Sequence, residues 1–178
     1  MSYAISKDGT LWIWGHNVYK QLGRDLGKFV FKPTKQPDLN GVVKIAGGIT
    51  HSIALTADGS VWTWGKNDKG ELGTNNPDGS LIPVKVALGG KATSIDAGNN
   101  SSIVLFDDNS AWTWGDNMSG QLGTGTTTSH TKPTKVKNLN KITAISCGTL
   151  HCLALTESGD LWSWGCNIMG QLGDKTNT

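Results

Sequence analysis

Short apolar segments, separated by small and polar turn residues, make up most of the chain. They come in pairs: the first segment ends in small residues and a glycine, and the second begins a few positions later. Segments of five or six residues bounded by turn formers are typical of β-strands. The pattern predicts first strands at 42–46, 92–97 and 142–147, and second strands at 51–56, 101–106 and 151–156.

A tryptophan-bearing third strand follows each second strand after a two-residue turn of the Asp-Gly type, which suits tight hairpins. Side chains alternate along a strand, so Trp12 and Trp14 share one face while Leu11 and Ile13 share the other. Both faces are therefore largely apolar, which indicates a sheet packed between two neighbouring sheets. We expect all eight tryptophans to be structural packing residues: Trp12, Trp14, Trp62, Trp64, Trp112, Trp114, Trp162 and Trp164.

The Trp-x-Trp-Gly motif recurs four times at a constant interval of 50 residues. A constant period of this length indicates a repeat architecture. We interpret residues 1–178 as a single repeat array with approximate units 1–41, 42–91, 92–141 and 142–178.

A fourth strand follows a longer loop in the first three units. We expect it to start at a proline (Pro33, Pro83 and Pro133) and to lie at the edge of its sheet, where no ladder donor is lost. Four short strands per unit predict an all-β fold, a β-propeller of four-stranded blades. The chain carries fourteen such strands, about 3.5 blades, or half of a seven-bladed ring.

Composition narrows the choice of partners. The net charge is only +2 and Arg24 is the one arginine, so we expect no nucleic-acid binding. No apolar run approaches the roughly 20 residues of a membrane span, and we expect a cytoplasmic protein without membrane contact. The three cysteines, Cys147, Cys152 and Cys166, include no C-x-x-C pair, and the expectation is that no disulfide framework forms.

Residues 48–73 resemble the regulator of chromosome condensation (RCC-type) repeat, G-x-x-H-[ST]-x-A-L-T-x-x-G-x-[LV]-[WY]-x-W-G-x-N-x-x-G-Q-L-G. Residues 148–173 follow the same pattern, and the resemblance covers essentially the whole chain. Departures are few: Lys20, Glu71 and Ser101 replace the usual glycine, glutamine and histidine. The resemblance implies a propeller, commonly with seven blades of about fifty residues.

The resemblance fixes the function much less than the fold, because the family includes GTPase exchange factors, photoreceptors, ubiquitin-ligase domains and enzyme inhibitors. The strict 50-residue spacing leaves no room for the inserted wedge of an exchange factor. The photoreceptor string G-W-R-H-T is also missing. We expect a non-enzymatic binding module for a protein or a small ligand, and sequestering or inhibiting a target is one form that this role can take. The alternatives are a structural fragment of a larger propeller, an exchange-factor-like regulator, and a propeller enzyme with a site in its central channel.

An arc of 3.5 blades exposes sheet faces and strand edges at each end. A homodimer that joins two chains head to tail would close the ring. The alternative is that further blades of a longer chain cover the ends.

Successive loops of a propeller alternate between its two faces, so the turn after strand one and the loop after strand three lie on one side. Positions there that differ between repeats are our candidate ligand- and partner-binding residues: His16, Lys66, Asp116 and Cys166 after strand three, and Thr50, Asn99, Asn100 and Thr149 after strand one. We interpret His51, His151 and Asn17 with its equivalents as structural hydrogen-bonding residues. The sequence lacks a phosphate-binding loop, a zinc spacing and a nucleophile elbow, so we expect no catalytic residues, metal or cofactor.

Overall fold

The computed structural model describes residues 1–177, which form fourteen strands and no helix. The first unit contains β1 (Ser2–Ile5), β2 (Leu11–His16) and β3 (Phe29–Gln36). The later units contain β4 (Val42–Gly47), β5 (His51–Thr56), β6 (Val61–Gly65) and β7 (Ser80–Lys85); β8 (Ala92–Ala97), β9 (Ser101–Phe106), β10 (Ala111–Gly115) and β11 (His130–Lys135); and β12 (Ile142–Cys147), β13 (His151–Thr156) and β14 (Leu161–Gly165). The predicted first and second strands are confirmed to within one residue.

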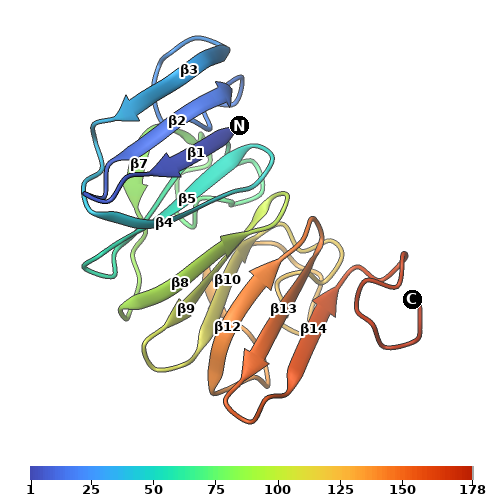
Figure 1. Ribbon diagram of the computed structural model, residues 1–178. Helices are drawn as coiled ribbons and strands as arrows, with labels where there is room; N and C mark the ends of the chain where they lie inside the picture. Colours follow the sequence, from blue (N-terminus) through green and yellow to red (C-terminus); the bar gives the residue numbers. More distant parts are fainter. Residues whose placement is uncertain (178) are drawn as a thin grey trace.

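Consecutive strands pair antiparallel, and each unit forms one sheet (Figure 1). The four sheets are β1-β2-β3, β4-β5-β6-β7, β8-β9-β10-β11 and β12-β13-β14. Within residues 1–177, the first sheet has no strand that corresponds to β4, and the last has none that corresponds to β7. This is the predicted arc of about 3.5 blades.

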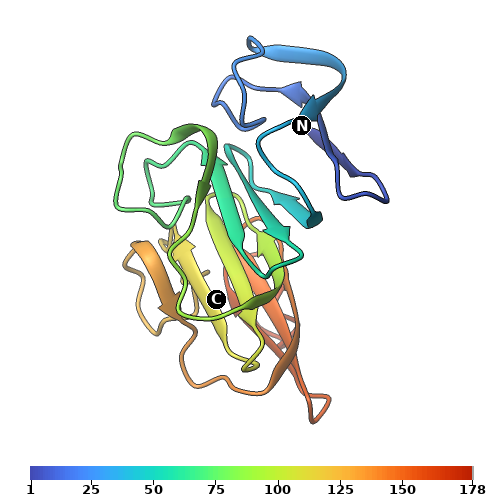
Figure 2. The same ribbon diagram turned by 90° about the vertical axis from the view of Figure 1, so that its left-hand side faces the viewer.

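The sheets stack face to face, as the two views in Figures 1 and 2 show. The first strands β4, β8 and β12 pack against one another along the inner edge, while β3, β7 and β11 form the outer edge. An aliphatic face of one sheet meets the tryptophan face of the next: Trp64 packs in one cluster with Leu11 and Ile13 of the first sheet. Trp114 packs in the same way with Ile53 and Val61 of the second sheet.

The tryptophans are packing residues, but not to the same degree. Trp64 and Trp114 are fully buried, whereas Trp162, on the terminal strand β14, is 50% exposed. Leu161 on the same strand is also exposed, because its aliphatic face has no following sheet among the described residues. At the second tryptophan of the motif, burial follows the number of neighbouring sheets: Trp64 and Trp114 lie between two sheets and are buried, whereas Trp14 and Trp164 on the terminal sheets are half-buried.

The fourth strands differ from the prediction in where they begin. They do lie at the sheet edge, but Pro33, Pro83 and Pro133 stand in the middle of β3, β7 and β11 and not at the start. In an edge strand, every other residue points its backbone nitrogen away from the neighbouring strand. A proline at such a position removes no hydrogen bond from the sheet. The pairing of β6 with the outer strand β7 also shifts register between Thr63 and Gly65. A proline is compatible with such an irregularity, because the regular hydrogen bonding is interrupted there.

Candidate interaction surface

Two sets of loops lie on one side of the array, as the alternation of propeller loops predicts. The amide of Lys66 donates to the carbonyl of Thr50 (3.0 Å), that of Asp116 to Asn100 (2.9 Å), and that of Cys166 to Leu150 (2.8 Å). In the second, third and fourth sheets, the loop after the third strand is thus fixed to the turn after the first strand of the same sheet. We call this side the loop face; it comprises the turns 47–50, 97–100 and 147–150 and the loops 16–28, 66–79, 116–129 and 166–174.

Hydrogen bonds also connect the turns of neighbouring sheets. The amide of Ile49 donates to the Asn99 carbonyl (3.0 Å), and the amide of Asn99 donates to the Thr149 carbonyl (2.9 Å). The Thr50 hydroxyl donates to Oδ1 of Asn100 at 3.2 Å. The inner part of the loop face is therefore a chain of mutually bonded turns that holds its side chains in fixed relative positions.

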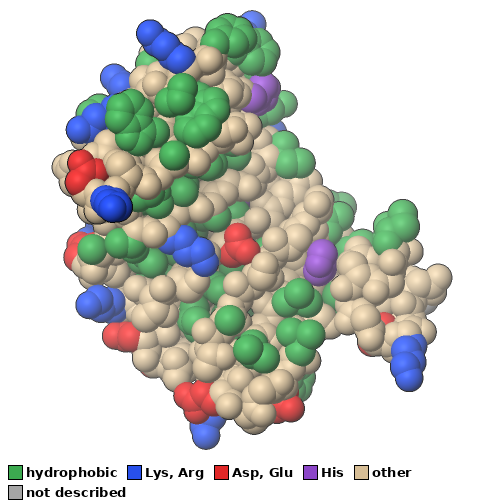
Figure 3. All heavy atoms as spheres, viewed as in Figure 1, with side chains coloured by type: hydrophobic (Ala, Val, Ile, Leu, Met, Phe, Trp, Pro, Cys, Tyr) green, Lys and Arg blue, Asp and Glu red, His purple; other side chains and the backbone are tan. Residues whose placement is uncertain are grey.

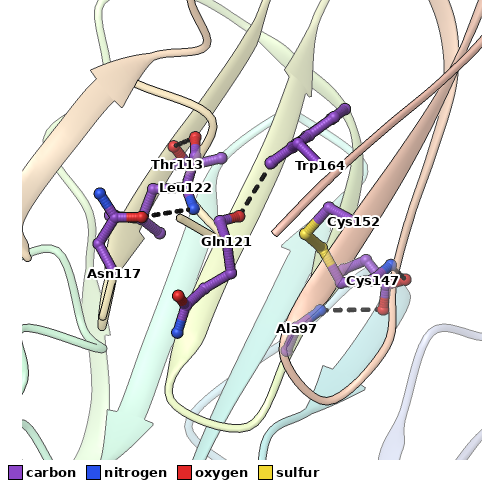
Figure 4. Close-up of a disulfide and its surroundings, with 9 residues drawn as sticks. Ala97, Thr113, Asn117, Gln121, Leu122, Cys147, Cys152 and Trp164 are labelled. Carbon is purple, nitrogen blue, oxygen red and sulfur yellow. Dashed lines mark hydrogen bonds between the residues drawn. A yellow bond between two sulfur atoms is a disulfide. The ribbon is translucent and has the colours of Figure 1, made fainter. Parts of the chain in front are cut away.

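Each loop after a third strand is closed by its asparagine. Oδ1 of Asn117 accepts the amide hydrogen of Leu122 at 2.9 Å (Figure 4). Nδ2 of Asn117 donates to the carbonyls of Thr126 and Thr128. Asn17, Asn67 and Asn167 accept from the equivalent leucine amides. The predicted structural role of these asparagines is confirmed.

The loops of one sheet also receive the tryptophan of the next sheet. The indole Nε1–H of Trp64 donates to the carbonyl of Gln21 (2.8 Å), and that of Trp114 donates to the carbonyl of Glu71 (2.8 Å). Trp164 repeats this bond to Gln121 at 3.0 Å (Figure 4). Sequence reasoning expected only apolar packing from these side chains, although the Leu-Gly that recurs after each Trp-x-Trp-Gly, preceded by glutamine or by Glu71, was the signal for a repeated contact.

The buried His51 links two sheets. Its Nε2 lies 2.9 Å from the hydroxyl oxygen of Ser102, and burial lowers the pKa of the imidazole to about 4. The ring is therefore neutral at physiological pH. A hydrogen-bonding role for His51, predicted from its repeat position, is confirmed.

The predicted binding residues after the third strands are partly engaged by their own loops. Asp116 is buried and accepts from Nε2 of Gln121 (3.2 Å), while Nδ1 of His16 lies 2.7 Å from Nε2 of Gln21. Lys66 pairs with the Asp68 carboxylate at 2.6 Å, and its ammonium lies 5.6 Å from the centre of the Tyr19 ring. Cys166 is a half-buried free thiol. Of the four turn residues, Thr149 is exposed, Asn99 and Asn100 are half-buried and Thr50 is buried.

Sequence reasoning missed the exposed apolar side chains of the loop face. Val18, Met118 and Ile168 occupy one repeat position and are 45%, 72% and 68% exposed. Three further exposed side chains, Tyr19, Ile49 and Met169, belong to the same loops and turns. Figure 3 shows groups of hydrophobic side chains along the right-hand edge, where the third strands end in Figure 1. Single exposed apolar residues are ordinary, but three of the four repeats carry one at this position, and we call them the apolar series of the loop face; the second repeat interrupts it with Asp68.

The expectation that no disulfide forms was wrong. Cys147 and Cys152 are joined by a disulfide (Figure 4). They face each other across the turn between β12 and β13, just as Ala97 faces Ser102 in the preceding sheet. The C-x-x-C criterion overlooked this pair because strand register, and not sequence spacing, brings the two sulfur atoms together. The carboxylate of Asp96 accepts the amide hydrogen of Cys147 (2.8 Å) and so fixes this turn to the third sheet.

Comparison with known proteins agrees with this geometry. Residues 8–55, 58–105 and 108–155 match the regulator of chromosome condensation (RCC1) repeat, and a second description of the same repeat matches 42–71, 92–121 and 142–171. The chain belongs to the RCC1 repeat family. The resemblance noted from the repeated motif is confirmed, and no curated protein matches the chain.

Solved structures of RCC1-type propellers share the fold of this RCC1-repeat chain. Yeast RCC1 (Prp20), in a structure with Kap60, is 24% identical with a TM-score of 0.85; the match covers 98% of this chain and 44% of that one. Human WBSCR16 is 23% identical with a TM-score of 0.84, over 93% of this chain and 45% of the other. The chain thus spans less than half the length of these structures. Among residues 1–177 no helix is long and apolar enough to cross a membrane.

Proposed function

We propose that this RCC1-repeat chain is a non-enzymatic interaction module that binds a protein partner through the loop face. The observation that carries the proposal is the recurrence of exposed apolar side chains at the position of Val18, Met118 and Ile168. Exposed apolar groups on a surface that is otherwise polar are typical of sites where another protein binds.

The rigidity of the loop face supports this role. Its turns are bonded to one another and its loops are closed by asparagines, so the apolar side chains are held in place before a partner binds. Preorganisation lowers the entropy that binding must overcome. The polar groups that could serve in catalysis are engaged elsewhere: Asp116 bonds within its loop, and His51 bonds between sheets.

The solved relatives are compatible with a protein partner. One structure shows Kap60 bound to yeast RCC1, and another concerns the binding of Prp20p to Gsp1p and histones. These statements apply to those proteins, which are more than twice as long as this chain. They show that the shared fold can bind other proteins.

We also propose that a second copy of the chain packs against the ends of the arc. Trp14 and Ser2 occupy the positions of Trp64 and Ser52, which both donate to the Gln21 carbonyl. Within residues 1–177, Trp14 and Ser2 have no such acceptor, and the Gln171 carbonyl, which corresponds to that of Gln21, has no such donor. The two ends are thus complementary to each other, and head-to-tail contact between copies would complete both sets of bonds.

The loop-face proposal is tested by affinity capture with three immobilised proteins. These are the wild type, the variant Met118→Glu with Ile168→Glu, and a control with Ala57→Glu in the hairpin on the opposite side. A captured protein is then purified and its affinity for each form is measured by calorimetry. We expect binding to the wild type and the control, and at least about tenfold weaker binding to the double variant. Equal affinity for all three forms would exclude the loop face as the binding surface.

A further inference from the structure

One repeat lacks the leucine that fills the space between neighbouring sheets. Leu39 and Leu139 occupy the same repeat position, and they are only 3% and 5% exposed. Both belong to apolar clusters, with Val42 and Ile142 respectively. In the second repeat the position holds Gly89, where a Cβ would meet no atom within 4 Å. The position that a leucine fills in the first and third repeats is therefore open, although the adjacent Leu88 packs, partly buried, against the cluster between the second and third sheets.

This space is a cleft of about 720 Å³ at the outer edge of the array. Its apolar lining includes Phe106 and Trp112 of the third sheet, whose rings meet edge to face at 6.0 Å between centroids. Leu88 and Pro133 complete that lining. Phe106 is itself particular to this repeat, because Thr56 and Thr156 occupy the equivalent positions. A volume of this size, with an aromatic wall, is in the range of small-molecule sites.

Cationic groups flank the aromatic wall. Lys85 on β7 and Lys132 on β11 line the cleft from the two neighbouring sheets, and neither forms an ion pair within the described part of the chain. Two carboxylates also line the cleft, those of Asp107 and Asp108; the amide and the hydroxyl of Ser110 donate to Asp108 (2.9 and 2.6 Å), and these bonds lower the pKa of its carboxyl group. Both carboxylates belong to the turn that follows β9, whereas the two ammonium groups stand on the outer strands β7 and β11.

We propose that this cleft binds a small aromatic anion. The aromatic part of the ligand packs against Phe106 and Trp112 in the space left by the missing leucine, and its acidic group lies between Lys85 and Lys132. Residues of both the second and the third sheet line the site, so the ligand bridges the second and third repeats. The site is separate from the apolar series on the loop face, and it does not depend on the proposed protein partner.

The test uses 8-anilinonaphthalene-1-sulfonate as the anionic probe and N-phenyl-1-naphthylamine as its uncharged counterpart. Binding is followed by probe fluorescence, and the site is located by the shift of the Trp112 indole resonance in NMR spectra. Gly89→Leu places in the cleft the side chain that repeats one and three already carry. Since Gly89 does not have a positive φ, this variant should fold like the wild type, which thermal unfolding checks.

We expect the anionic probe to shift the Trp112 resonance and to bind at least about tenfold more weakly to Gly89→Leu and to the double variant Lys85→Ala with Lys132→Ala. Lys35→Ala is the matched control, because Lys35 holds the position of Lys85 on the outer strand of the first sheet. It should bind the probe like the wild type. Unchanged binding to Gly89→Leu, or no shift at Trp112, would overturn the site, and equally tight binding of the uncharged probe would overturn its preference for anions.

Discussion

His51 shows how a single repeat position combines packing with electrostatics. The imidazole is buried between the second and third sheets, and the Ser102 hydroxyl is its one hydrogen-bond partner among the described residues. Burial without a counter-charge lowers the pKa, because the charged ring would lose its hydration. The third repeat has Ser101 at this position, so the fold accepts a smaller polar residue there.

His51 should make stability depend on pH. The folded pKa of about 4 lies below the ordinary value of 6.5, so the unfolded chain takes up a proton first as the pH falls. The free energy of unfolding should therefore decrease between about pH 6.5 and pH 4, by about 3 kcal/mol in total. Denaturant unfolding at several pH values measures this dependence. In His51→Ser, the free energy of unfolding should fall by about 3 kcal/mol less than in the wild type between about pH 6.5 and pH 4. The same change of this free energy with pH in both proteins would contradict a buried neutral imidazole.

At the residue scale, sequence reasoning identified the repeated asparagines and histidines as structural but could not see which polar groups meet across strands. The disulfide between Cys147 and Cys152 depends on the register of one hairpin. The cleft at Gly89 could be recognised only once the structure showed that the equivalent Leu39 and Leu139 are buried between sheets. The disulfide and the cleft both depend on which residues are close in space, and the order of residues along the chain does not show this.

At the scale of the elements, the alternation of side chains was enough to place nearly every strand. The two-residue turns and the apolar runs fix β4 to β6 and their counterparts, because each local preference agrees with the packing of the sheet. The fourth strands were harder, since β3, β7 and β11 lie at the edge and contain more polar residues. Their starts are set by pairing with the third strand and not by a local signal.

The bond from each indole to the preceding sheet should contribute to stability. Trp114→Phe keeps an aromatic ring but removes the donor to the Glu71 carbonyl, and it leaves space where the larger ring was. We expect a loss of about 2–3 kcal/mol in the free energy of unfolding. Trp162→Phe is the comparison, because Trp162 is half-exposed, and it should cost less than about 1 kcal/mol. Denaturant titrations measure both, and equal losses would argue against a specific role for the buried indole.

At the scale of the whole molecule, the arc of sheets and the common side of its loops followed from the 50-residue period. The sequence did not reveal that the loop face carries an apolar series, because Val18, Met118 and Ile168 lie in loops where no periodic pattern applies. It also gave no information on the partner, since the fold is compatible with many functions.

The proposed contact between copies predicts association that specific substitutions abolish. Added Cβ atoms at Gly23, Gly73 and Gly123 would lie 2.8–2.9 Å from the indole of the following sheet, whereas at Gly173 a Cβ would meet nothing within 4 Å. Gly173→Asn should therefore leave the single chain intact, since asparagine tolerates a positive φ, but it should obstruct Trp14 of a second copy. Sedimentation velocity should show association of the wild type and a monomer for Gly173→Asn. A wild type that stays monomeric at high concentration would contradict self-association and favour further blades of a longer chain as the cover.

The stacking of successive repeats through their tryptophans underlies the loop face, the cleft and the proposed contact between copies alike. Hydrogen exchange of the indole Nε1–H groups, followed by NMR, tests it most directly. The account predicts slow exchange for Trp64, Trp114 and Trp164, which donate to carbonyls of the preceding sheet, and fast exchange for the exposed Trp162. Fast exchange at Trp64 and Trp114, at a rate similar to that of Trp162, would contradict it.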